Sequence, residues 1–236
     1  MIVRGTSNFY DLSIGNYGPA FDTNPEHPLS FVRTTIIESK KYISKVRRAA
    51  LAQKNLSKMY PNPGSNPLAD QLKIAAQLIG GGLQSKIYIA NQDGFDTHDG
   101  QVDSSDSTKG DHANLLSQLS VAVAAFQDDL ALMGKQDHVL TMIFSEFGRR
   151  IMSNASYGCD HGTSAPVFLL GSKLKGGLIG KNPEIPTKAA VNDNLPLQLD
   201  FRSLYASILK GWFGVSDLEL NATLLRSYPV LDLFKC

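Results

Sequence analysis

The sequence predicts an α/β fold in which a sheet of buried strands is flanked by helices on both faces. Three observations support this. Apolar residues recur at spacings of three and four in several long segments, which is the pattern of amphipathic helices. Short, continuous apolar segments alternate with them and are typical of strands buried on both faces of a sheet. No internal repeat or low-complexity linker is visible, so a single domain over residues 1–236 is expected.

Four helices are predicted, each with a recognisable beginning. The first begins near Pro28, and the second is capped by Asn66 and ends at the glycines 80–82. Asp111 begins the third and Asp200 the fourth. The residues expected to face the core are Leu68, Leu72, Ala75, Ala76 and Ile79 in the second helix, Leu115, Leu119, Val123, Phe126, Leu130 and Met133 in the third, and Phe201, Leu204, Tyr205, Ile208, Leu209 and Trp212 in the fourth.

Three strands are predicted, at residues 86–91, 138–145 and 166–170, and residues 1–26 are expected to be irregular. Only residues 147–159 separate Glu146 from Asp160, and a helical crossover needs about a dozen or more residues including its helix. The strand at 166–170 is therefore expected to run antiparallel to the strand at 138–145. Its beginning, with Asp160 and His161, would then lie beside Glu146.

Composition excludes several classes of function. The 23 basic side chains balance 22 acidic ones, so a formal charge of +1 gives no electrostatic case for nucleic acid or an anionic membrane. No stretch approaches the ~18 consecutive apolar residues of a membrane-spanning helix. No signal peptide is visible, so a cytoplasmic location is the default expectation. Two cysteines are too few for a disulfide scaffold, and the motifs of P-loop, dinucleotide-binding and serine-hydrolase proteins do not occur.

Polar residues gather at the ends of the predicted strands, where open α/β sheets bind their ligands. They occupy residues 93–101, 145–150 and 159–162. Carboxylate and imidazole groups are the ligands of zinc, manganese or iron in open hydrolytic sites. A divalent metal ion (zinc, manganese, calcium or magnesium) is therefore expected, and it would polarise a phosphoryl or sulfuryl oxygen. The candidate ligands are Asp96, His98, Glu146, Asp160 and His161.

Several neighbouring residues have two interpretations. Arg149 either clamps a substrate oxyanion, a catalytic role, or pairs with a surface carboxylate. His112, in the first turn of a helix, either faces the site or does not. Thr97 is a weak candidate nucleophile, because no positioned base is apparent. Cys159 has no second cysteine at metal-ligand spacing and is interpreted as a small residue of the fold.

The strings GFDTHDGQ (94–101), SEFGRR (145–150) and CDHG (159–162) resemble the family called domain of unknown function 1501. KGGLIG (175–180) and LDFRSLYASIL (199–209) resemble the same family, and the order and separations of all five strings match it. The resemblance covers roughly residues 66–215. That family is related to the alkaline phosphatase and sulfatase superfamily, whose members use one or two divalent metals on an α/β sandwich. The resemblance implies an alkaline-phosphatase-like sheet that is mostly parallel. Many family members carry a twin-arginine export signal, which is not seen here.

The resemblance also implies roles. Asp96 and His98 are similar to the first metal-binding pair of the superfamily, and His161 to a late metal-binding histidine before an antiparallel strand. Glu146 stands where relatives place an Asp-His pair, but Phe147 replaces the histidine. Family members are longer upstream, where the superfamily supplies a further aspartate ligand and the nucleophile. Nothing in residues 1–83 matches, so the N-terminal part of the fold is expected to be missing.

The leading hypothesis is a metal-dependent hydrolase acting on a small anionic ester of phosphate or sulfate. The alternative is a non-catalytic metal-binding or structural protein that keeps the scaffold, because the segment with the nucleophile is not matched. A third hypothesis is that the chain needs a partner, since a sheet that lacks its first strands exposes an edge and apolar faces. That partner would be the missing N-terminal fragment or a second copy of the chain in a homo-oligomer.

Overall fold

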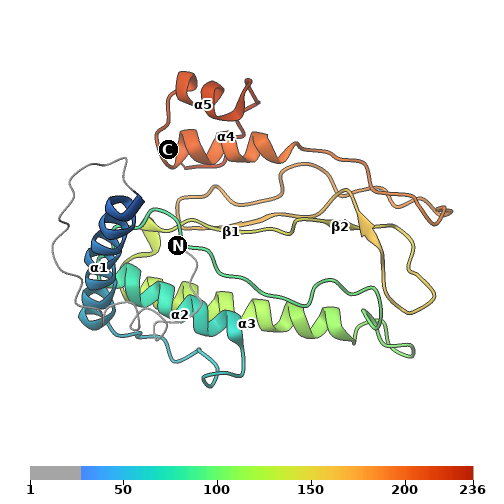
Figure 1. Ribbon diagram of the computed structural model, residues 1–236. Coiled ribbons are helices and arrows are strands. Elements are labelled where there is room, and N and C mark those ends of the chain that lie inside the picture. The colour runs from blue at the N-terminus through green and yellow to red at the C-terminus, as the bar shows by residue number, and fades with distance from the viewer. Residues whose placement is uncertain (1–27, 236) are drawn as a thin grey trace. The chain divides into compact units, whose positions relative to one another are not determined.

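The computed structural model describes residues 28–235 and confirms the mixed α/β class. The helices are α1 (Pro28–Ala52), α2 (Pro67–Gly80), α3 (Asp111–Leu132), α4 (Phe201–Gly211) and α5 (Asp217–Leu224), with a 3-10 turn at Gln136–His138 (Figure 1). The strands are β1 (Thr141–Ile143), β2 (Gly148–Arg149), β3 (His161–Gly162) and β4 (Phe168–Leu170). The predicted irregular opening, residues 1–26, lies outside the described residues.

The chain forms two compact units, each made of two segments. Of the described residues, the helical unit comprises 28–95 and Asn114–Gln136, and it contains α1, α2 and most of α3. The strand unit comprises Asp96–Ala113 and Asp137–Cys236, and it contains the four strands, α4 and α5. The single domain expected from the sequence stays a prediction.

The helical unit has two clusters of buried apolar side chains, one between α1 and α2 and one between α2 and α3. Val46 and Ala49 of α1 pack against Leu78 of α2. On the other side of α2, Leu68 and Ala69 pack against Ala122 of α3. The cap predicted for α2 is confirmed, since the Asn66 side chain accepts from the Ala69 N–H. Its buried face is the one predicted except that Ala69 and Leu78 are buried in place of Leu72 and Ile79, which are half-buried.

A buried carboxylate ties α3 to the segment that follows α1. Asp129 is fully buried, and its oxygens accept from the Asn55 side chain at 2.7 Å, the Leu56 N–H at 2.7 Å and the Ser57 N–H at 3.0 Å. A buried carboxylate needs such donors to replace the water that it loses. By length and composition alone α3 could cross a membrane. Six of its residues are buried within the protein, and the charged Asp129 is among them.

The strand predicted at residues 86–91 was expected to be buried, and this part of the prediction is wrong. Only Ile89 is in a bridge, no ladder forms among the described residues, and Ile87 and Ile89 are exposed. An apolar segment becomes a strand only where another backbone lies within hydrogen-bonding distance. Among the described residues, a side chain contacts the end of this segment: Gln71 of α2 accepts from the Asn91 N–H at 3.0 Å and donates to the Asn91 carbonyl at 2.9 Å.

In the strand unit, all the described strand pairs are antiparallel. β1 pairs with β4 in the register Thr141↔Leu170, Met142↔Leu169 and Ile143↔Phe168, as the short connection predicted. The strands are shorter than predicted, and the side chain of Phe168 is exposed. β2 pairs with β3 through Gly148↔Gly162 and Arg149↔His161. This second ladder brings His161 and Gly162, the end of the CDHG segment, beside the SEFGRR segment.

The fourth helix begins where predicted, at the N-cap Asp200, but it buries a different face. Its buried residues are Ser203, Ala206 and Ser207, and Phe201 is exposed. The reason is a polar contact: the Ser207 hydroxyl donates to the Ser203 carbonyl at 2.6 Å and accepts from the Leu231 N–H at 2.7 Å. Helix α5, which packs against α4, was not predicted, although Ser216 and Glu219 form a capping box that the sequence displays.

Candidate metal centre

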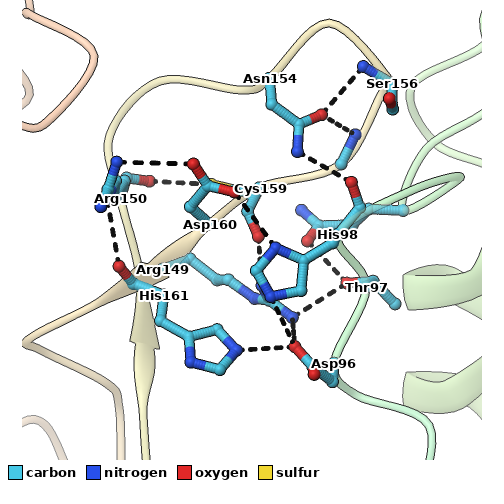
Figure 2. Close-up of polar contacts among 12 residues, drawn as sticks. Asp96, Thr97, His98, Arg149, Arg150, Asn154, Ser156, Cys159, Asp160 and His161 are labelled. Carbon is cyan, nitrogen blue, oxygen red and sulfur yellow. Dashed lines mark hydrogen bonds and ion pairs between the residues drawn. The ribbon is translucent and has the colours of Figure 1, made fainter.

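Three loops of the strand unit meet at one place (Figure 2). The β2–β3 ladder sets Arg149 opposite His161, and the Cys159 N–H donates to the Thr97 carbonyl at 3.2 Å. Gly158 makes this approach possible, because a Cβ there would lie 2.1 Å from the His98 carbonyl oxygen. The Asn154 side chain then holds the same carbonyl through a hydrogen bond of 2.8 Å. The loops are thus joined mainly by backbone contacts.

Asp96 is the residue that both histidines contact. Its Oδ1 lies 2.6 Å from Nε2 of His161 and 3.0 Å from Nε2 of His98. Together the donor atoms of these three residues lie within 4.8 Å of one another. The two imidazole centroids are 4.8 Å apart, and all three side chains are about half exposed. The structure therefore brings together three of the five predicted ligands in a group open to solvent.

The other two predicted ligands lie outside this group. Asp160 contacts the opposite nitrogen of His98, with Oδ1 at 3.1 Å from Nδ1, and its Oδ2 lies 3.4 Å from Nη1 of Arg150. Glu146 is exposed and is not among the grouped donors of the described residues. The β2–β3 ladder positions His161, and the hydrogen bond from the Cys159 N–H to the Thr97 carbonyl holds the loop with Asp96 and His98 beside it. Glu146 precedes that ladder.

The Arg149 guanidinium is a cation beside Asp96, and hydrogen bonds hold it in place. Its Nη1 donates to the Cys159 carbonyl, its Nη2 donates to the Thr97 hydroxyl at 3.3 Å, and Nη2 lies 3.7 Å from Oδ1 of Asp96. The guanidinium is mostly buried and is fixed by both loops. Thr97 is itself 5 % exposed and donates to Gln101 at 2.8 Å, which leaves its hydroxyl poorly placed to attack a substrate.

Phe147 is the residue of the centre that the sequence analysis missed. Its ring stacks on His161, with the centroids 3.8 Å apart and the planes 9° apart, and the Arg149 guanidinium lies 5.0 Å from its centroid. The replacement of a histidine by Phe147 was noted only as a loss. No local sequence signal marked it, because its stacking depends on the β2–β3 register. His112 is not among the grouped donors, and its backbone N–H donates to the Gln101 carbonyl.

The electrostatics favour charged carboxylates. The hydrogen bond with His161 lowers the pKa of Asp96, helped by the charges of His98 and Arg149. The hydrogen bond with His98 lowers the pKa of Asp160, and Arg150 adds to the effect. Both side chains are therefore anionic at neutral pH, which is the form that binds a cation.

The three donors fit a transition metal ion in kind, and the two Asp96–histidine separations are near the spacing that such an ion needs. A tetrahedral site with bonds of about 2.0–2.2 Å separates its donors by roughly 3.3–3.6 Å. The observed Asp96–His161 and Asp96–His98 separations of 2.6 and 3.0 Å need to open by less than about an ångström to reach that range. Two imidazoles with one carboxylate suit zinc, manganese or iron better than calcium or magnesium, which prefer oxygen ligands.

One comparison with known proteins gives a match. The family described as "Protein of unknown function (DUF1501)" matches residues 43–224, a range that includes every segment of the candidate metal centre. No curated protein and no solved structure matches the chain.

Proposed function

The chain belongs to the DUF1501 family, and we propose that it is a metal-dependent hydrolase of phosphate or sulfate esters. In this proposal the fold is of the alkaline phosphatase and sulfatase type, with a mostly parallel sheet. The observation that carries the proposal is the group formed by Asp96, His98 and His161, whose donor atoms lie within 4.8 Å. Two imidazoles that converge on one carboxylate form the open three-ligand pattern of catalytic zinc sites.

In the proposed centre, Asp96, His98 and His161 hold the metal ion, and Glu146 and Asp160 are not needed as ligands. When bound, the ion would supply a Lewis acid for the ester oxygen and an activated water. The half-exposed side chains leave room for a small anionic substrate. Arg149 attracts that substrate, because its guanidinium is the cation beside Asp96 and is held in place by the Cys159 carbonyl.

Metal analysis tests the first half of the proposal. We expect the purified chain to bind zinc or manganese stoichiometrically and to lose this binding when His98→Ala and His161→Ala are combined. The matched control is His112→Ala with His138→Ala, which removes two histidines outside the grouped donors and should leave metal binding unchanged. Equal and negligible metal content in the wild type and the first double variant would refute the proposal.

Turnover tests the second half. We expect hydrolysis of an aryl phosphate or an aryl sulfate that depends on added zinc or manganese and is lost in Asp96→Ala. Asp99→Ala removes the same charge three residues away and should retain the activity. Metal binding without turnover of either ester would indicate a non-catalytic metal-binding protein and not a hydrolase.

The non-catalytic alternative is supported by one observation. Thr97, the hydroxyl closest in sequence to the proposed ligands, is buried and is engaged by Gln101 and Arg149. A centre without a usable nucleophile binds a metal and an anion without cleaving the ester. The alternative predicts that phosphate or sulfate binds competitively to the metal-loaded chain, with no product at any metal concentration.

A further inference from the structure

We propose that Asp160 is a positioning residue, which fixes the tautomer and orientation of His98 so that this histidine presents Nε2 to the metal. This inference rests on the proposed metal centre and assigns Asp160 a role outside the ligand set. The sequence analysis placed Asp160 among the ligands, because it directly precedes His161.

The two nitrogens of His98 face different carboxylates. Nε2 lies 3.0 Å from Oδ1 of Asp96, inside the group of donors, and Nδ1 lies 3.1 Å from Oδ1 of Asp160 (Figure 2). A neutral imidazole has one N–H donor and one acceptor. An ionised carboxylate can only accept, so Asp96 and Asp160 compete for the single proton of neutral His98. Oδ1 of Asp96 already has a closer donor, Nε2 of His161 at 2.6 Å, so the Nδ1–H form satisfies Asp160 and leaves the Nε2 lone pair for a metal ion that binds between His98 and Asp96. Ligating histidines commonly make such an outer contact with a carboxylate.

The second carboxylate oxygen of Asp160, Oδ2, is contacted by Arg150. Nη1 of Arg150 lies 3.4 Å from Oδ2 of Asp160 and donates to the Asn192 side chain at 2.6 Å, while Nε donates to the His161 carbonyl at 3.3 Å. The backbone agrees with this, since the Arg150 N–H donates to the Asp160 carbonyl at 3.1 Å. The Asp160 carboxylate is therefore directed toward Nδ1 of His98 by contacts that do not involve the donor group.

The test uses the full chain, zinc as the probe and two readouts. Zinc affinity is measured by competition with a chromogenic chelator for the wild type, Asp160→Asn, Asp160→Ala and His98→Ala. The His98 tautomer is measured without metal by nitrogen-15 NMR at roughly pH 8.5, about two units above the ordinary histidine pKa. The matched control is Asp99→Asn, which removes a carboxylate adjacent to His98 in the chain.

We expect Asp160→Ala to weaken zinc binding about 10–100-fold, the usual cost of losing an outer partner of a ligand. Asp160→Asn should lose less, because its amide oxygen still accepts from Nδ1–H. The wild type should hold His98 in the Nδ1–H form, and Asp160→Ala should move it toward the Nε2–H form. Asp99→Asn should change neither readout, and thermal unfolding should confirm that every variant is folded.

Two results would overturn the inference. If Asp160→Ala abolished zinc binding as completely as His98→Ala, Asp160 would be a ligand. If the His98 tautomer were the same in the wild type and in Asp160→Ala, the contact would have no orienting effect. If the wild type bound no zinc, the proposed function would fail, and the tautomer measurement on the metal-free chain would still decide whether Asp160 controls His98.

Discussion

The helical unit and the strand unit are held together in different ways. In the helical unit, apolar side chains such as Leu78 and Ala122 are fully buried between helices, and the charge of Asp129 is enclosed with three donors. In the strand unit the ladders are two or three residues long, and loops are joined by backbone hydrogen bonds and exposed charges. The helical unit is therefore stabilised mainly by the burial of side chains. The strand unit leaves reactive groups exposed at the surface and is stabilised less by burial.

The difference shows how one chain can carry an open site. Asp96, His98 and His161 must remain accessible to a cation, so they cannot contribute the burial that stabilises the helical unit. Their positions depend instead on close backbone approaches, such as that of Gly158 to the His98 carbonyl. We therefore expect substitutions in the two units to separate stability from metal binding.

The largest effect is expected from Asp129→Ala in the helical unit. This change leaves the Asn55 amide and the Leu56 and Ser57 N–H groups without their buried acceptor. Each orphaned donor costs about 1–3 kcal/mol, so the loss of the acceptor for three donors should lower the free energy of unfolding by at least about 3 kcal/mol. Urea unfolding followed by circular dichroism measures this loss.

The neighbouring Asp128→Ala is the control for Asp129→Ala, and it should change the free energy of unfolding by less than about 0.5 kcal/mol. In the variants that remain folded, zinc affinity should be the same as in the wild type. A loss of zinc affinity in folded Asp129→Ala would show that the two units are coupled, and the comparison between them would fail.

The second effect concerns backbone approach, and Gly158→Ala tests it in the strand unit. An added Cβ would meet the His98 carbonyl oxygen at 2.1 Å, and a backbone group cannot rotate away. The loop must shift, at a cost of about 1–3 kcal/mol, and the shift displaces His98. We expect zinc affinity to fall at least tenfold, as measured by chelator competition.

Gly80→Ala is the matched substitution in the helical unit. There the added Cβ would meet only the side chains of Gln53 and Met133, at 2.6 and 2.7 Å, and flexible side chains can move. Alanine also favours the helix by up to about 1 kcal/mol. Stability should be nearly unchanged or slightly higher. If both variants lost stability equally, contact with a backbone group would not explain the effect of Gly158→Ala. The helical unit has such an approach as well, at Gly81, where an added Cβ would lie 2.0 Å from the Ala49 carbonyl oxygen.

The contrast also explains how far the sequence could predict the structure. The apolar period and the cap at Asn66 predicted α2, because both signals are local. The short segment 147–159 predicted the antiparallel pairing of β1 and β4, because chain length limits the possible connections. The segment 86–91 was predicted as a strand, but an extended segment needs a partner that its own residues cannot specify.

The candidate metal centre was predicted by residue type and only partly by geometry. Asp96, His98 and His161 come together, as carboxylates and imidazoles at segment ends suggested. The outer position of Asp160 could not be read from the sequence, since it depends on which side of the His98 ring faces the loop. The stacking of Phe147 on His161 likewise follows from the β2–β3 register, which no local pattern encodes.

A smaller effect is expected from Phe147→Leu, which removes the ring stacked on His161 but keeps an apolar side chain. Aromatic pairs contribute about 0.5–1.5 kcal/mol beyond burial, so zinc affinity should fall about 2–10-fold as the imidazole loses its orientation. Chelator competition measures the change. The control is Phe144→Leu, an exposed ring three residues away that should leave zinc affinity unchanged. Equal zinc affinities in the wild type, Phe147→Leu and Phe144→Leu would show that Phe147 has no role in the metal centre.

The smallest effect is a pH dependence at the start of α4, where Asp200→Asn removes a charge but keeps a residue that caps helices well. Hydrogen bonds from Arg202 lower the pKa of Asp200 from 3.8 to about 2 in the folded chain. A lowered folded pKa stabilises the protein above the unfolded value, and this contribution is lost as the pH falls through the folded value.

The thermal midpoint of Asp200→Asn should therefore lie below that of the wild type at pH 7, and the gap should close between about pH 4 and pH 2. Differential scanning fluorimetry over this range measures the gap. Asp217→Asn removes one charge from an exposed pair with Lys210, and it should shift the midpoint little at pH 7 because such pairs contribute little. A gap for Asp200→Asn that persisted unchanged at pH 2 would mean that the loss comes from the cap itself. The polar contacts of the strand unit would then stabilise it through geometry and not through charge.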